Sequence, residues 1–435
     1  MATAPVKMSS GRERDTRYSF HATISDDSPF GSGWKPRSVT GGRIRQSFGE
    51  GAIRHDSITS IKSSRGSLFI PDTISEARRQ SLAPEIPAGP AFGEEPPFTL
   101  HKAMLSRLTT EYQDWYNEYL IDHKFMVNTH LYEPTLLRKG GRTVPGPSPC
   151  LDLPTADFDV PARDDNPAVP VRVWWPSNSE MPKGGWPVFV WAHGGGWILG
   201  SKNTENNFTT RIAEWSKCCV VSVGYRLAPE NPYPDCLEDF WDVLLWLHNN
   251  PELLKINIDR VAIGGSSAGG NIASVVAHQY PNSELPPLKF QMLLVPVTDN
   301  TAGPTTHLSW KENEFTPQLP AAKMLVYRDY YLPHESLWTQ PEASPIFFSD
   351  DSFKKLAPAL VVSASADVLR TENELYAAKI KANGVSVRHD IYQGVPHHAM
   401  GLCQVLTQGR ELILECSKVL RHQFYGHDDL VTEWK

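Results

Sequence analysis

Short apolar runs alternate with amphipathic stretches from about residue 157 to the end of this chain. The apolar runs are nearly continuous and rich in Val, Ile and aromatic residues, as in strands that are buried on both faces of a sheet. Strands are expected at residues 170–175, 187–193, 219–225, 260–265, 289–297, 358–365 and 385–392. Helices are expected at residues 209–217, 240–250, 271–278 and 374–384. The alternation predicts an α/β fold with a mostly parallel sheet and helices on both faces.

Two segments depart from this alternation. Ahead of it, apolar and aromatic residues recur at steps of three and four, which predicts one amphipathic helix. These residues are Leu105, Leu108, Tyr112, Trp115 and Tyr119. Such a helix fits a cap over an active site or a plain core-packing helix equally well. Later, the aromatic-rich stretch 300–340 interrupts the strand pattern and predicts a helical insertion. We expect cap segments at about 98–145 and 300–340.

Residues 1–95 have a different composition, rich in Ser, Gly, Pro and Arg and poor in long apolar runs. Such a segment cannot bury enough apolar surface to offset its ordering entropy. We therefore predict a disordered tail, with at most a short helix near residues 74–81, and a folded domain over 96–435. The motifs RIRQS and RRQS, which end at Ser47 and Ser81, resemble basophilic kinase sites and make the tail a candidate kinase target. A functionless extension is the simpler interpretation.

Composition and charge exclude several classes of protein. The net charge of −7 gives no strong attraction to nucleic acid or to anionic membranes. No stretch approaches the roughly 20 apolar residues of a membrane span, and the N-terminus lacks the apolar core of a secretory signal. The six cysteines form no CxxC pair. We expect a cytoplasmic protein, a monomer or a dimer, without a nucleic-acid partner.

The sequence GGSSAGGN, residues 264–271, contains two candidate nucleophiles. A nucleophilic serine at a sharp strand-to-helix turn needs small residues two positions before and after it, which gives G-x-S-x-G. Ser267 is flanked by Gly265 and Gly269, whereas the frame around Ser266 ends at Ala268. A predicted strand precedes the motif and a predicted helix follows it. Ser267 is therefore the predicted nucleophile, and a Gly/Ser-rich turn without chemistry is the alternative.

A serine hydroxyl needs a base, and the base needs an acid that holds it in place. Downstream of the nucleophile, Asp367 is the first acidic residue after a predicted strand. Glu372 lies inside the following helix, and we expect it to point elsewhere. His397 follows the next strand and is the predicted base, with His398 as the alternate. The order of serine, acid and histidine is that of nucleophile-elbow hydrolases.

The tetrahedral intermediate of acyl transfer needs N–H donors for its negative oxygen. The stretch HGGGW, residues 193–197, follows a predicted strand, and its glycines allow backbone N–H groups to converge on one point. Gly195 and Gly196, with Ala268 after the nucleophile, are the predicted oxyanion hole. Gly194 is the alternative if the register differs by one residue.

These motifs resemble the hormone-sensitive-lipase-like branch of α/β-hydrolases, which includes arylacetamide deacetylases and many carboxylesterases. The resemblance runs from about residue 170 to 424 and is carried by HGGGW, YRLAPENPYP, GGSSAGGN, SPIF, ASADVLR and GVPHHAMG. It implies that Glu230 and Asp239 support the fold near the site, with plain surface carboxylates as the alternative for both, and it calls for no metal or organic cofactor. One departure is Ser266, where the family usually has Asp. We expect Ser266→Ala or Ser266→Asp to retain much of the activity, and Ser267→Ala to abolish it.

The resemblance implies a serine hydrolase that cleaves esters of short, medium or aromatic acids through an acyl-enzyme. The same triad can open an amide, a lactam or a lactone, so a small-molecule ester or amide is the expected substrate. A non-catalytic ligand-binding protein is the alternative from another class. It fits less well, because the histidine is present.

Overall fold

A mixed β-sheet forms the centre of the computed structural model, which describes residues 22–24, 97–122, 129–139, 150–163, 166–177 and 179–429. The strands are β1 (Ala22–Ile24), β2 (Thr155–Val160), β3 (Val169–Trp174), β4 (Trp186–Ala192), β5 (Cys219–Val223), β6 (Ile256–Ser266), β7 (Phe290–Leu294), β8 (Ala359–Ala366) and β9 (Val387–Pro396). Their order in the sheet is β1-β2-β3-β5-β4-β6-β7-β8-β9. The strands from β5 to β9 in this order pair in parallel, and the pairs among β1, β2, β3 and β5 are antiparallel.

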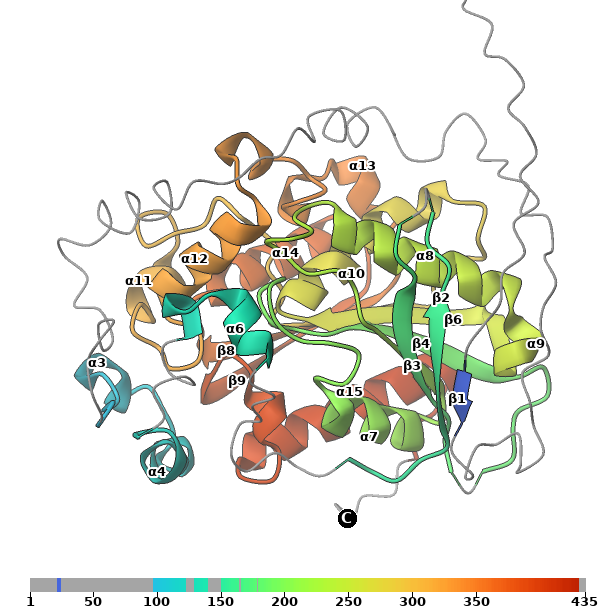
Figure 1. Cartoon of the computed structure of the whole chain (residues 1–435), viewed down its shortest axis with the longest axis horizontal. Coiled ribbons are helices and arrows are strands. Elements are labelled where there is room, and N and C mark those ends of the chain that lie inside the picture. The colour runs from blue at the N-terminus through green and yellow to red at the C-terminus, as the bar shows by residue number, and fades with distance from the viewer. Residues whose placement is uncertain are drawn as a thin grey trace, which may run out of the picture.

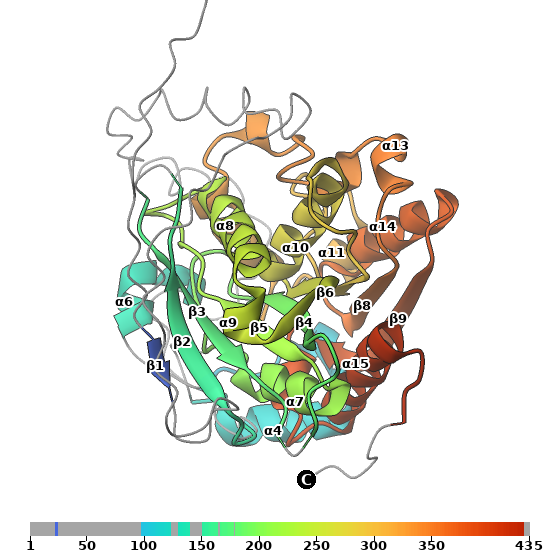
Figure 2. The same cartoon turned by 90° about the vertical axis from the view of Figure 1, so that its right-hand side faces the viewer.

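Helices cover both faces of the sheet (Figures 1 and 2). One face carries α8 (Asp235–Asn249), α9 (Pro251–Leu254), α10 (Ala268–Gln279), α13 (Asp350–Phe353) and α14 (Arg370–Ala382). The opposite face carries α7 (Asn206–Ser216) and α15 (Thr407–Tyr425), which pack on the outward side chains of the central strands. Because both faces are covered, β4, β5 and β7 are buried along their whole length. The predicted α/β fold with a mostly parallel sheet is confirmed.

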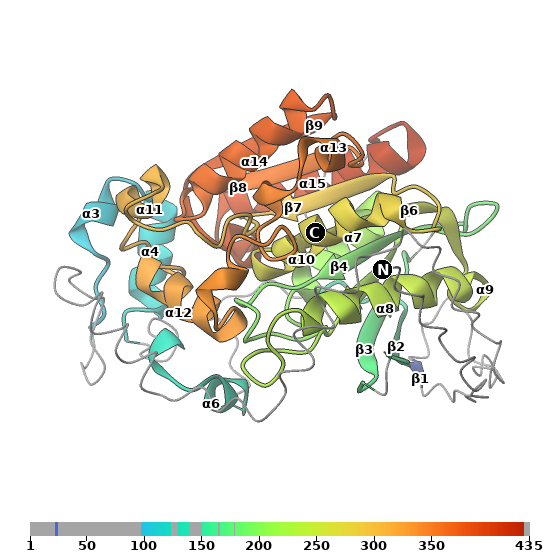
Figure 3. The same ribbon diagram turned by 90° about the horizontal axis from the view of Figure 1, so that it is seen from above.

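The remaining helices gather beyond one end of the sheet (Figure 3). They are α3 (Lys102–Leu105), α4 (Thr110–Tyr119), α6 (Pro134–Lys139), α11 (Leu308–Glu312) and α12 (Ala321–Tyr331). A separate apolar cluster joins this region to the strands, because Tyr112 and Trp115 of α4 pack with Ala366 at the end of β8 and Val395 in β9. The two segments that we expected to form a cap therefore contain helices at the carboxyl end of the parallel strands.

The single helix expected around residues 105–119 was wrong in its extent. The structure has two helices, and the chain turns between Leu105 and Thr110. Thr109 explains the break: its side chain caps α4 by accepting the N–H of Tyr112, and its own N–H donates to Gly394 O at 2.8 Å. A continuous helix would lose both bonds. Leu105 consequently lies on the surface, with 45% of its area exposed.

The predictions for residues 1–95 lie almost entirely outside the described residues. β1 is the described part of that segment, and both kinase-like motifs and the short helix near 74–81 fall outside it. The six cysteines carry free thiols, and five of them are buried. Among the helices of the described ranges, none has the length and apolar character needed to cross a membrane.

Candidate active site

Ser267 occupies the tight turn between β6 and α10. Its backbone has φ 54° and ψ −119°, a strained conformation for a residue with a side chain, and its N–H donates to Leu294 O at 2.8 Å. The flanking glycines leave no room for a Cβ. At Gly265 a Cβ would overlap the backbone of Gly269, and at Gly269 it would overlap the carbonyl oxygen of Ala192. The size requirement that selected this frame in the sequence therefore has a direct steric cause.

Three side chains meet in one hydrogen-bonded line. The hydroxyl of Ser267 lies 2.8 Å from His397 Nε2, and His397 Nδ1 lies 2.7 Å from Asp367 Oδ2. A carboxylate accepts, so it favours the tautomer with the proton on Nδ1 and leaves a lone pair on Nε2 that faces the serine. Asp367 is fully buried, and its second oxygen accepts the N–H of Leu369 at 3.1 Å. The structure thus brings together the three residues predicted as nucleophile, base and acid.

The alternates considered from the sequence lie elsewhere. His398 has a left-handed backbone with φ 57°, and its Nδ1 is 4.0 Å from Glu205 Oε1, away from the serine line. Glu372 is buried in α14, where its carboxylate accepts the N–H groups of Thr298 and Asp299. Burial raises the pKa of Glu372 well above its ordinary value. Neither residue is placed to orient or deprotonate Ser267.

Both segments that we expected to form a cap hold the strand ends that carry Asp367 and His397. Asn313, which follows α11, donates its amide to Asp367 O at 2.8 Å and to Ser365 O at 3.1 Å. Arg107, ahead of α4, donates to Asn313 Oδ1 at 3.0 Å. On the histidine side, Gly394 O accepts the N–H of Thr109. The position of the acid and the base therefore depends on segments far away in sequence, which the motifs did not reveal.

The HGGGW loop lies beside the serine turn. Gly195 and Gly196 have φ 128° and φ 61°, and a Cβ on Gly196 would overlap the ring of Tyr327 in α12. Gly194 donates its N–H to Glu205 Oε1 at 3.2 Å, so this group is already engaged. The N–H groups of Gly195 and Gly196 have no acceptor within the described ranges. Ala268, the third predicted donor, is the first residue of α10.

His193 shapes this loop as a neutral side chain. Its ring stacks on Tyr225 with centroids 4.2 Å apart, and Nδ1 lies 2.7 Å from Gly194 O. Burial lowers the pKa of His193 to about 4, so the ring is uncharged at neutral pH. Tyr225 in turn donates its hydroxyl to His193 O at 2.8 Å. These contacts fix the start of the glycine run.

Glu205, one residue before α7, is a buried carboxylate that we did not predict from the sequence. Its Oε1 accepts the hydroxyl of Ser266 at 2.6 Å as well as the N–H of Gly194, and its Oε2 accepts Trp191 Nε1 at 2.7 Å. Burial raises the pKa of Glu205 to about 7, although all three hydrogen bonds favour the charged form. Glu205 therefore ties the glycine loop to the serine turn. No motif or periodicity marks it in the chain.

Glu230 and Asp239 have different surroundings. Asp239 is fully buried and accepts both the backbone N–H of Arg226, at 2.7 Å, and its guanidinium. Glu230 is half exposed and pairs with Arg138 at 2.8 Å. The buried pair supports the loop after β5, and the exposed pair contributes little.

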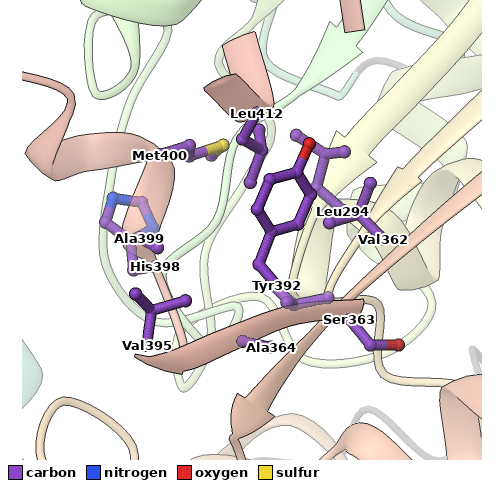
Figure 4. Close-up of a pocket in the computed structure, with 11 residues that line it drawn as sticks. Leu294, Val362, Ser363, Ala364, Tyr392, Val395, His398, Ala399, Met400 and Leu412 are labelled. Carbon is purple, nitrogen blue, oxygen red and sulfur yellow. The ribbon is translucent and has the colours of Figure 1, made fainter. Parts of the chain in front are cut away.

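A small apolar pocket lies behind the histidine loop, between β8, β9 and α15 (Figure 4). Tyr392, Met400 and Leu412 point into it, and His398 lies at its edge. None of the three residues of the serine line borders it. This pocket is therefore not the place where an ester would meet the serine. The described residues contain no group of three or more His, Cys, Asp or Glu that could hold a metal ion.

Comparison with known proteins places the chain in a family. Residues 189–401 match the family model described as alpha/beta hydrolase fold. An AB hydrolase superfamily protein of Schizosaccharomyces pombe is 46% identical over 330 residues, covering 75% of this chain and 96% of the relative. A carboxylesterase of Mycobacterium tuberculosis is 35% identical over 220 residues, covering 50% of this chain and 67% of the relative.

Solved structures agree with this placement. A hyperthermophilic esterase from the archaeon Pyrobaculum calidifontis superposes with a TM-score of 0.60 and 30% identity, covering 72% of this chain and 98% of that structure. An α/β hydrolase enzyme from the metagenome of Lake Arreo gives a TM-score of 0.65 at 26% identity, covering 73% of this chain and 99% of that structure. The chain therefore belongs to the α/β-hydrolase family, in its hormone-sensitive-lipase-like branch.

Proposed function

We propose that this protein is a serine carboxylic ester hydrolase that works through an acyl-enzyme. The observation that carries the proposal is the line from Ser267 through His397 to Asp367, with separations of 2.8 Å and 2.7 Å. Such a line is what a weakly nucleophilic hydroxyl needs in order to lose its proton as it attacks. The family adds support, because its named relatives include a carboxylesterase and an ethyl acetate hydrolase.

In the first half of the reaction, Ser267 Oγ attacks the carbonyl carbon of the ester and its proton passes to His397 Nε2. The carbonyl oxygen, which becomes negative, accepts hydrogen bonds from the N–H groups of Gly195, Gly196 and Ala268. When the intermediate collapses, the bond to the alcohol oxygen breaks and the imidazolium returns its proton to that oxygen. Asp367 stabilises the imidazolium and stays ionised throughout.

In the second half, His397 takes a proton from water as the water oxygen attacks the acyl carbon. The carbon–Oγ bond then breaks, the proton returns to Ser267 Oγ, and a carboxylic acid leaves. All of these steps use groups of this chain and water alone. The proposed substrates are esters of short, medium or aromatic acids. Amides and lactones fit the same chemistry and belong in the same substrate panel.

The test uses p-nitrophenyl acetate and butyrate together with a fluorophosphonate probe. We expect hydrolysis of both esters and covalent labelling at Ser267. If the purified protein neither cleaves the esters nor reacts with the probe, the proposal fails and a ligand-binding role takes its place. We further propose that residues 96–435 form the catalytic unit. Deletion of residues 1–95 should then leave turnover within a few-fold, and a large loss would show that the tail contributes to the site.

A further inference from the structure

One face of α12 lies along the HGGGW loop. Lys323, Tyr327 and Tyr331 are spaced by four residues and therefore share this face. Tyr331 stacks on Trp197 with centroids 4.2 Å apart and planes 7° apart, and the ring of Tyr327 covers Gly196. Successive residues of the face thus follow the loop from its tryptophan back toward the glycine that we propose as an oxyanion donor. Figure 3 shows α12 on the same side of the molecule as the other cap helices.

Lys323 continues this face one helical turn beyond Tyr327, about 6 Å further along the helix axis. Its ammonium lies 5.8 Å from the centroid of the Tyr327 ring. Burial is the main cause that lowers the pKa of His398 to about 4, and the positive charges of protonated His397 and of Lys323 lower it further. The ammonium thus lies next to the ring that covers Gly196, and it is near enough to the histidine loop for its charge to act on His398.

Lys323 is buried without a counter-ion. Lys323 has 7% of its area exposed, and among the described residues no carboxylate forms an ion pair with it or raises its pKa. Burial lowers the pKa of Lys323 to about 8, so the amine is still mostly protonated at neutral pH. A largely buried ammonium beside a reaction site attracts an anion, because no carboxylate of the described residues offsets its charge.

We propose that Lys323 binds a carboxylate carried by the substrate, so that the preferred substrates are half-esters of dicarboxylic acids. This inference rests on the proposed esterase function and names its substrate class. The free carboxylate of such a half-ester would supply the missing counter-charge while Ser267 attacks the esterified end. A neutral ester leaves the ammonium desolvated and unpaired, so it gains no such interaction. The site thereby favours substrates that carry a negative charge.

The test compares two substrates of equal length, monoethyl glutarate and ethyl pentanoate, with ester cleavage followed by titration of the acid released. We expect the wild type to favour the half-ester in kcat/KM. In Lys323→Met, which keeps the length of the side chain and removes its charge, the ratio of the two kcat/KM values should fall at least tenfold, mainly through KM. Lys311→Met is the matched control, because Lys311 is an exposed lysine of the same insertion. Its ratio should equal that of the wild type.

An unchanged ratio in Lys323→Met would overturn the inference, as would an equal loss on both substrates. A second measurement needs no variant: glutarate should inhibit cleavage of p-nitrophenyl butyrate competitively and at least tenfold more strongly than the neutral pentan-1-ol. Neutral pentan-1-ol, which has the same number of carbon atoms, is the charge-free comparison, and inhibition by glutarate no stronger than by pentan-1-ol would also overturn the inference. If the wild type neither cleaves the esters nor reacts with the fluorophosphonate probe, the proposed function is refuted instead. Retained cleavage of ethyl pentanoate without any charge preference would refute the role of Lys323 alone.

Discussion

Replacement of Asp367 by Asn tests the assignment of the acid most sharply. In the wild type, Asp367 Oδ1 accepts the N–H of Leu369 at 3.1 Å and Oδ2 faces His397 Nδ1 at 2.7 Å. In Asp367→Asn the remaining carbonyl oxygen stays on the N–H of Leu369, so the new amide NH₂ faces His397 Nδ1. The imidazole of His397 must then accept a hydrogen bond at Nδ1 and carry its own proton on Nε2. In this tautomer Nε2 has no lone pair that could take the proton of Ser267.

We expect this wrong tautomer to lower kcat by about 10⁴-fold, the size of the effect in a serine protease with the same arrangement. That factor corresponds to about 5 kcal/mol of transition-state stabilisation. The assay is the initial rate on p-nitrophenyl butyrate at saturating substrate, with thermal unfolding to confirm that the variant folds. Because Asn is close in size to Asp, the fold should be retained.

Glu372→Gln is the matched control, since Glu372 is also a fully buried carboxyl group, five residues further along the chain. It accepts the N–H groups of Thr298 and Asp299 and the indole N–H of Trp310, and it touches no residue of the serine line. Its replacement should destabilise the fold by about 1–3 kcal/mol and leave kcat within a few-fold. Retention of kcat within tenfold in Asp367→Asn, or an equal loss in Glu372→Gln, would refute the assignment.

Three further predictions concern the serine turn, the glycine loop and a buried histidine. Ser267→Ala should abolish turnover on p-nitrophenyl butyrate, and Ser266→Ala, which removes a hydrogen bond outside the serine line, should retain at least a tenth of it; the reverse result would overturn the choice of serine. Gly196→Ala should lower kcat at least 100-fold or prevent folding, because φ is 61° and the Cβ would overlap a tyrosine ring, whereas Gly303→Ala, with nothing within 4 Å of its Cβ, should be active. Burial lowers the pKa of His278 to about 3, so the unfolded chain binds its proton first and stability falls as pH drops from about 6.5 toward 3. Between pH 7 and 5, urea unfolding should show the wild type losing about 2 kcal/mol more than His278→Gln, and an equal loss would contradict the neutral buried ring.

The sequence predicted the fold class and the order of the elements because these depend on short-range patterns. Near-continuous apolar runs at residues 187–193 and 219–225 mark strands buried on both faces, and the structure has β4 and β5 there. The choice between Ser266 and Ser267 was also local, since the steric demand of the turn falls on residues two positions away. Each of these inferences concerns groups that are neighbours in the chain.

Other predictions depended on contacts that the chain order does not reveal. The helix expected around residues 105–119 breaks because Thr109 bonds to Gly394, a residue 285 positions away (394 − 109). The sequence could rank His397 above His398 only by reach, whereas the left-handed backbone of His398 directs the two rings apart. A shift of one residue along the chain turns a side chain to another face. The choice between His397 and His398 therefore needed the folded loop.

The sequence by itself determined the α/β fold, the serine at the turn and the candidates for its partners, because small residues and apolar periodicity act over a few positions. The tertiary structure decided what surrounds them. No motif marks Glu205 or Lys323. In the fold, the buried carboxylate of Glu205 joins the glycine loop to the serine turn, and Lys323, for which we propose a role in substrate binding, is a buried lysine. Burial changes the cost of a charge, and burial is a property of the whole fold.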